Sequence, residues 1–122
     1  MKKIYISGAM YGLPKEQQEA FFRNEAERVQ LRGWHSVVPH DILPDHRSHD
    51  HIGDCPRAYS PGASCFLRGD LEAMLKCDAV LMIGEWHESV GAPREHDVAI
   101  WTGIKIYYRA EDVPYLETER SS

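Results

Sequence analysis

Several features that would direct the fold or the function are scarce or missing in this sequence. Only three cysteines occur, Cys55, Cys65 and Cys77, and this odd number supplies no disulfide framework, so we expect free thiols. The net charge is −5, which argues against nucleic acid as the main partner, because phosphate backbones are bound by clustered Lys and Arg. No apolar run is long enough to cross a bilayer, and the N-terminus has no signal-peptide pattern. We therefore expect a cytoplasmic protein with no membrane partner.

What the sequence does contain is the pattern of a small globular domain. Its 122 residues, 43% of them hydrophobic, fit one domain over residues 1–122. Short apolar segments alternate with segments of helical periodicity, which is typical of a parallel sheet with helical connections. The expected strands are 3–8, 34–38, 79–83 and 104–108, and the expected helices run from about 15 to 32, from 64 onward, and from near 93 to 103. The predicted fold is α/β: a small doubly wound, Rossmann- or flavodoxin-like parallel sheet of about four or five strands, with helices on both faces.

Two segments show no regular period. Residues 39–63 are rich in proline and glycine, and we interpret them as a long loop, because structureless stretches of this length often form lids or binding loops. Their histidines suggest a metal, but the H-x-x-H-x-H spacing is not a standard zinc pattern, so a hydrophilic loop without metal is favoured. These histidines are His40, His46, His49 and His51. The acidic tail from Glu111 is expected to fray, with one short element around 113–116.

A candidate site lies where the buried strand 79–83 leads into the helix that begins near Pro93. Glu95 falls in the first turn of this helix, and Ser89 falls in the loop before it. The exposed N–H groups of a helix start favour an anion. Open α/β sheets bind ligands at the carboxyl ends of their strands, and this junction lies at such an end.

Each polar residue near this junction also has a structural explanation. The helix dipole favours Glu95, serine commonly satisfies helix starts as Ser89 would, and Asp70 can be a solvated helix residue paired with a nearby basic side chain. Taken singly, each is better explained by structure than by function. Together with Tyr5, however, they fall where consecutive strand-to-helix units of one sheet meet, which favours a common site.

Two other features at strand ends leave their interpretation open. Gly8 and Gly12 punctuate the turn after the first strand, which resembles a nucleotide-binding turn but matches neither G-x-G-x-x-G nor G-x-x-x-x-G-K-[ST]. They can equally be turn residues with positive φ. Trp86 and His87 follow the strand 79–83, where an aromatic side chain can line a base or sugar pocket or simply cap the sheet.

Four segments, taken in order, resemble the nucleoside 2-deoxyribosyltransferase superfamily, in particular its small phage-associated members and those like 2′-deoxynucleoside 5′-phosphate N-hydrolase. The segments are Tyr5-Ile6-Ser7-Gly8-Ala9-Met10-x-Gly12, Leu67-Arg68-x-Asp70-Leu71, Cys77-Asp78-Ala79-Val80 and Ser89-x-Gly91-x-x-x-Glu95. The resemblance covers residues 3–38 and 64–108 and fails over most of the loop between them, so we treat residues 39–63 as an inserted loop.

The resemblance implies a role for each matching residue. Glu95 corresponds to the family's nucleophilic glutamate, Asp70 to the acid that handles the proton of the departing base, and Tyr5 to the tyrosine that orients the nucleophile. Ser89 stands where the transferases carry an aspartate for the sugar 5′-hydroxyl, and where relatives that hydrolyse nucleoside 5′-monophosphates carry a serine for the phosphate. A hydroxyl and helix N–H groups attract a phosphate, whereas a carboxylate repels it. The remaining expected substrate-binding residues are Ser7, Gly8, Met10, Gly12, Trp86, Gly91 and Arg94.

The chemistry agrees with these residue types. Breaking an N-glycosidic bond builds positive charge on the sugar carbon, which a carboxylate can stabilise or trap covalently, and the base leaves readily only when an acid protonates it. Our first hypothesis is an N-glycosidase acting on (deoxy)nucleoside 5′-monophosphates. The alternatives are a base-exchanging nucleoside 2-deoxyribosyltransferase and a non-catalytic nucleotide-binding protein. No cofactor or metal is expected, and the resemblance implies a homodimer or larger homo-oligomer.

Overall fold

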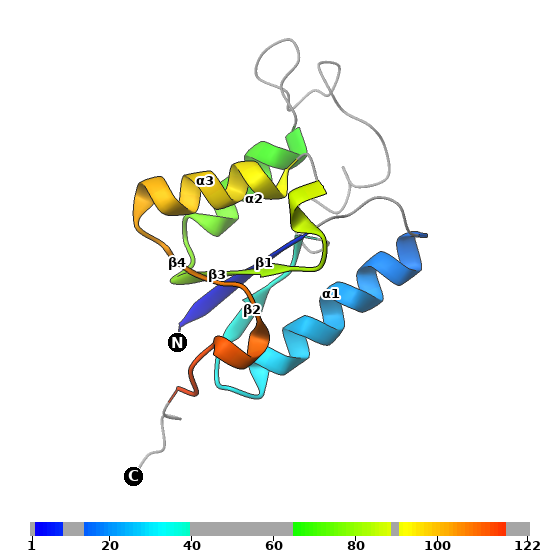
Figure 1. The fold of residues 1–122 in the computed structure, drawn as a ribbon, viewed down its shortest axis with the longest axis vertical. Coiled ribbons are helices and arrows are strands. Elements are labelled where there is room, and N and C mark those ends of the chain that lie inside the picture. The colour runs from blue at the N-terminus through cyan, green and yellow to red at the C-terminus, as the bar shows by residue number, and fades with distance from the viewer. Residues whose placement is uncertain (1, 9–13, 40–64, 89–90, 117–122) are drawn as a thin grey trace.

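The computed structural model describes residues 2–8, 14–39, 65–88 and 91–116, which build a parallel sheet with helices on both faces. The described strands form one four-stranded sheet in the order β2-β1-β3-β4. The strands are β1 (Lys3–Gly8), β2 (His35–Val37), β3 (Ala79–Ile83) and β4 (Lys105–Tyr107), and the helices are α1 (Lys15–Gln30), α2 (Cys65–Met74) and α3 (Ala92–Thr102), with the 3₁₀ helices η3 (Trp86–Glu88) and η4 (Ala110–Asp112). Helix α1 covers one face, and α2 and α3 cover the other (Figure 1). The predicted doubly wound α/β fold is confirmed.

Glycines with positive φ mark where two of the helices stop. Gly103 caps α3 with φ 78°, and Gly33 follows α1 with φ 95°. Glycine adopts this left-handed conformation readily because it has no Cβ. Helix α1 ends at Gln30, slightly before the predicted end near residue 32, and Leu31, which follows it, is 83% exposed. None of the helices within the described ranges combines the length and the apolar character that crossing a membrane requires.

Alternate side chains of β1 enter two different hydrophobic clusters. Ile4 and Ile6 pack with Phe22 of α1 on one face, while Tyr5 packs with Met74 of α2 on the other. This division follows from the two-residue period of a strand, which sends successive side chains to opposite faces. Every residue of β3 is buried, as expected for a central parallel strand that is covered on both sides.

The chain after β4 packs against the α1 face of the sheet instead of fraying. Val113 is fully buried, and the backbone N–H of Leu116 donates to the carbonyl of Arg32 at 2.8 Å. The short element is η4, which precedes the predicted position at 113–116. The expectation of a frayed tail from Glu111 is therefore wrong for residues 111–116, because tertiary packing and hydrogen bonds order this acidic segment.

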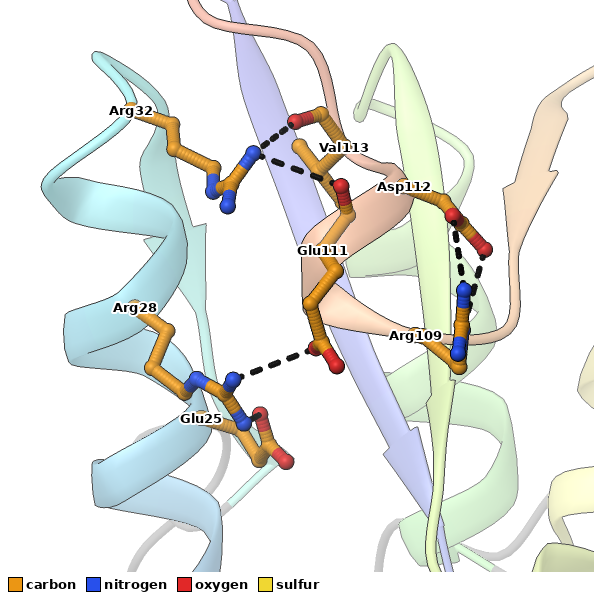
Figure 2. Close-up of polar contacts among 7 residues, drawn as sticks. All are labelled: Glu25, Arg28, Arg32, Arg109, Glu111, Asp112 and Val113. Carbon is orange, nitrogen blue, oxygen red and sulfur yellow. Dashed lines mark hydrogen bonds and ion pairs between the residues drawn. The ribbon is translucent and has the colours of Figure 1, made fainter.

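Arg32 links this C-terminal segment, residues 110–116, to the end of α1. Its Nη1 donates to the carbonyl of Val113 at 2.9 Å and to that of Glu111 at 3.4 Å (Figure 2). The guanidinium also lies over the ring of Tyr115, 4.4 Å from its centroid. Arg28, one turn earlier, reaches the Glu111 carboxylate at 3.1 Å, but both of these side chains are 52% exposed. An exposed ion pair of this kind contributes little to stability.

We predict that Arg32→Ala lowers the free energy of unfolding by about 1–2 kcal/mol, because a charge-assisted bond to a partly buried carbonyl is lost. Urea denaturation measures the change. Arg28→Ala is the matched control, since it removes the same charge from the same end of the chain's first helix and should cost under about 1 kcal/mol. Equal losses in the two variants would contradict the larger contribution to stability that we assign to Arg32.

The fold alters the protonation of the Cys77 thiol. It lies in the cluster of Tyr5 and Met74, and its burial raises the pKa of the thiol from 9.0 to about 11, because desolvation disfavours the thiolate. A nearby Lys3 charge offsets only part of this effect. The thiolate is the form that reacts with alkylating agents.

Near pH 8 we therefore expect iodoacetamide to label Cys77 about 100-fold more slowly in the folded protein than in the chain unfolded by urea. Peptide mass spectrometry assigns the label to Cys77 and separates it from the other cysteines. The difference should shrink as the pH rises toward 11, since the folded thiol then ionises. Similar labelling rates near pH 8 would show that burial does not suppress the thiolate.

Candidate functional site

The candidate site lies at the carboxyl ends of β1 and β3, where the connections leave toward opposite faces of the sheet. From β1 the chain passes through α1 to β2, whereas from β3 it passes through α3, on the other face, to β4 (Figure 1). Gly8 and Ile83 are register partners at this end of the two strands. A topological switch point of this kind is where open α/β sheets bind ligands.

Gly8 allows the ends of β1 and β3 to approach each other closely. A Cβ at this position would lie 2.7 Å from Cγ1 of Ile83 and 2.9 Å from its carbonyl oxygen, which a side chain could not tolerate. The positive-φ glycines of the described residues are Gly33, Gly84 and Gly103, so the positive-φ interpretation is wrong for Gly8. Close packing of the two strand ends explains this glycine instead.

Tyr5 and Ser7 present two hydroxyl groups on the same face of β1. They are two residues apart in a strand, so both side chains point toward the helical layer formed by α2 and α3. Both residues are fully buried. A buried hydroxyl needs a hydrogen-bond partner, and both find theirs on α3.

That partner is the carboxylate of Glu95. Gly91 precedes α3, and Pro93 lies in the first turn of this helix. The Glu95 N–H donates to the carbonyl of Gly91 at 3.0 Å, and the Glu95 side chain extends toward β1. Tyr5 donates its phenolic O–H to Oε2 at 2.9 Å, and Ser7 donates its hydroxyl to Oε1 at 2.5 Å. Glu95 is only 4% exposed.

The geometry of this Tyr5–Ser7–Glu95 cluster suits a negative charge. The Ser7 contact falls in the range of charge-assisted O–H···O⁻ bonds, about 2.5–2.7 Å. Donors on both carboxylate oxygens favour the ionised form, and the position in the first turn of α3 adds the favourable end of the helix dipole. The helix dipole alone, which was the structural explanation for Glu95, would leave the residue exposed at the helix surface. It does not account for a buried carboxylate that is hydrogen-bonded to another element.

Asp70 lies on the same side of the sheet as this cluster. It is only 6% exposed, which excludes the interpretation of a solvated helix residue. In α2 it precedes Met74 by one turn, and residues four apart share one face of a helix. Met74 packs in the cluster that contains Tyr5, so Asp70 belongs to the face of α2 that looks toward the sheet.

Trp86 forms an aromatic cluster beside the start of α3. Its ring stacks on His87, with centroids 3.8 Å apart, and on His96, with centroids 4.6 Å apart. His96 is also hydrogen-bonded to the hydroxyl of Tyr108, with 2.8 Å between Nε2 and the oxygen. The cluster holds η3 against α3 and against the end of β4. His96, its member on α3, directly follows Glu95 in the sequence. The structure thus places Trp86 against α3, and the two interpretations of this residue, as part of a pocket or as a cap of the sheet, both stay open.

The remaining predicted site residues are distributed unevenly. Gly91 precedes α3, and Arg94 is exposed in its first turn. Met10, Gly12 and Ser89 lie outside the described residues. The predicted loop 39–63 also lies outside them, apart from Pro39. Among the residues that are described, no three His, Cys, Asp or Glu side chains are grouped as metal ligands.

Sequence reasoning missed two features of this site. It placed Ser7 among the substrate-binding residues, whereas the structure shows its hydroxyl on the Glu95 carboxylate. It also did not connect His96 and Tyr108 with Trp86. The alternation of β1 carried a signal for the first, since Ser7 must share a face with Tyr5. The second depends on the packing of β4 and had no local signal.

These features define a doubly wound parallel α/β protein with a buried, hydroxyl-bonded carboxylate at the switch point of its sheet. Residues 2–108 match the family described as a domain of unknown function (DUF4406), and the chain belongs to this family. No curated protein and no solved structure matches the chain. The family description names no activity, so the likeness to the nucleoside 2-deoxyribosyltransferase superfamily stays a prediction.

We predict that Tyr5→Phe lowers the free energy of unfolding by about 1–3 kcal/mol near neutral pH, because the buried Glu95 carboxylate loses one donor. Tyr108→Phe provides the control, since it removes a hydroxyl whose bond to His96 is exposed, and should cost under about 1 kcal/mol. Urea denaturation of both variants gives the comparison. A Tyr5→Phe loss no larger than the control would mean that the bond to Glu95 does not matter for stability.

Proposed function

We propose that this protein is an N-glycosidase that cleaves the base–sugar bond of (deoxy)nucleoside 5′-monophosphates through a covalent glutamyl-sugar intermediate. The observation that carries the proposal is the Glu95 carboxylate, buried at the switch point and bonded to Tyr5 and Ser7. The sequence resemblance to the nucleoside 2-deoxyribosyltransferase superfamily supports the same assignment. In that resemblance Glu95 corresponds to the nucleophile and Tyr5 to the residue that orients it.

The rigid placement of Glu95 suits this reaction. As the base departs, positive charge develops on the sugar carbon, and a fixed carboxylate stabilises that charge without having to reorganise. Two hydrogen bonds from one strand hold the carboxylate in a single orientation, so one oxygen can be aimed at the sugar carbon when a substrate binds. The carboxylate then forms the covalent bond, as in retaining glycosidases.

Asp70 supplies the second group that the reaction requires. A nucleobase leaves poorly as an anion, and an acid that protonates it lowers the barrier. Asp70 is buried in α2, in the helical layer that also contains Glu95. We propose that its carboxyl gives a proton to the departing base and then accepts one from the attacking water.

The choice of a 5′-monophosphate rests on residue 89 and on the start of α3. A serine in place of the aspartate found in the transferases suits a phosphate, and the N-terminus of α3 offers a favourable dipole to an anion. The overall charge of −5 does not oppose this, since local donors decide the binding of a small anion.

A panel of nucleosides and nucleoside 5′-monophosphates, incubated with the protein and analysed by chromatography for free base, tests the proposal. Base release from monophosphates supports it. Base exchange only when a second base is added supports the transferase, and tight binding without turnover supports a nucleotide-binding protein. Either of these last two outcomes would overturn the proposed hydrolysis.

We predict that Glu95→Gln abolishes base release, with a loss of at least about 10³-fold, because an amide cannot form the glycosyl intermediate. The fold should persist, since an amide of nearly the same size can still bond to the Tyr5 and Ser7 hydroxyls, which rotate to donate or accept. Circular dichroism and urea denaturation check the fold. Glu88→Gln is the control, since this exposed glutamate lies in η3 near the site and should keep full activity. Substantial turnover by Glu95→Gln would exclude Glu95 as the nucleophile.

A further inference from the structure

We propose that Ser7 is a positioning residue that stabilises the anionic carboxylate of Glu95 and thereby favours release of the sugar over the initial attack. This inference rests on the proposed function, and it concerns the half of the reaction in which the enzyme is regenerated. It assigns to Ser7 a role directed at Glu95 instead of at the substrate.

The observation is the asymmetry of the two hydroxyl contacts. Ser7 lies 2.5 Å from Oε1, whereas Tyr5 lies 2.9 Å from Oε2, so Ser7 makes the shorter bond. Ser7 is fully buried and stands in β1, a strand covered on both faces. A short bond from a buried donor is strongest when its acceptor carries a full charge.

The charge on Glu95 changes twice during the proposed reaction. In the first step a carboxylate oxygen bonds to the sugar carbon, the carbon–nitrogen bond breaks with its electrons going to the base, and Asp70 protonates the base. In the second step the oxygen of water bonds to the sugar carbon, the ester bond to Glu95 breaks with its electrons returning to the carboxylate, and the proton of water passes to Asp70. Glu95 is therefore anionic before the first step and after the second, and neutral between them.

The direction of the Ser7 effect follows from this cycle. A donor that binds the anion more tightly than the ester lowers the free energy of the reactant in the first step, which slows attack. The same donor lowers the free energy of the carboxylate as it departs in the second step, which speeds release. Ser7 thus prevents the covalent intermediate from accumulating, and its loss should have the opposite consequence.

The test compares the wild-type protein with Ser7→Ala in rapid mixing with the best monophosphate of the panel. In Ser7→Ala we expect a burst of free base followed by turnover about tenfold or more below wild type, the usual effect of one hydrogen bond to a charged group. Intact-protein mass spectrometry should show the sugar phosphate attached to the chain. Ser7→Cys, which nearly keeps the volume but donates weakly, should fall between the two and replaces Ser7→Ala if that variant does not fold.

Ser36→Ala is the matched control. Ser36 lies on β2, and its hydroxyl accepts a bond from Gln30 at the end of α1 and not from any group of the Glu95 cluster, so this variant should show neither a burst nor an adduct. If base release by Ser7→Ala slows from the first turnover without an adduct, the inference about Ser7 is overturned while the proposed function stands.

A measurement that needs no turnover separates the two ideas further. The carbon-13 signal of the Glu95 carboxyl, assigned through Glu95→Gln, should titrate at higher pH in Ser7→Ala than in the wild-type protein, because the anion has lost a donor. An unchanged titration overturns the role of Ser7 whatever the activity. If wild-type protein releases no base at all, the proposed function and the release step fail together, and the titration alone decides whether Ser7 stabilises the anion.

Discussion

The hydrogen bonds from Tyr5 and Ser7 to Glu95 connect parts of the chain that are 90 and 88 residues apart in sequence. A carboxylate at 4% exposure is unfavourable unless such bonds replace its water. The donors can reach it only when β1 lies beside β3 and α3 lies across the sheet. The orientation of this carboxylate is thus a result of the complete fold and cannot form from a local segment.

Strand β1 makes this possible because its two faces serve different purposes. Ile4 and Ile6 pack against α1 through apolar contacts. On the opposite face of the strand, Tyr5 and Ser7 donate hydrogen bonds to Glu95. On the α1 face, the C-terminal segment 110–116 adds further cover through Val113 and the Arg32 bonds (Figure 2). A strand packed in this way on one face presents the two hydroxyl groups of its other face to the Glu95 carboxylate in fixed positions.

The sequence predicted the elements whose signals are local. The bounds of β1 and β3 agree with the prediction because each is a short apolar run that ends at glycine, and α3 stops at Gly103 as expected. The prediction for residues 111–116 was wrong, because their order depends on the packing of Val113 with α1 and on hydrogen bonds to Arg32, which lie far away in the sequence. The candidate site divides in the same way. Glu95 was singled out by its place in a helix start taken together with the other polar residues at this junction. The alternation of β1 places Ser7 on the face of Tyr5, but the bond from Ser7 to Glu95 also depends on where α3 packs over the sheet, which no local pattern encodes.

The energetics of Glu95 favour a functional explanation over a structural one. Burying a carboxylate costs several kcal/mol, and hydrogen bonds such as those from Tyr5 and Ser7 offset this cost. An aliphatic side chain at this position could pack against Ala92 and Ala99, which face the same cluster, and would leave no charge to compensate. Replacing buried charged groups by well-packed apolar side chains is often neutral or stabilising, so a buried charge is weak evidence of a role in stability. A buried carboxylate that is held in one orientation, at the end of the sheet where such folds bind ligands, is typical of sites that bind or react.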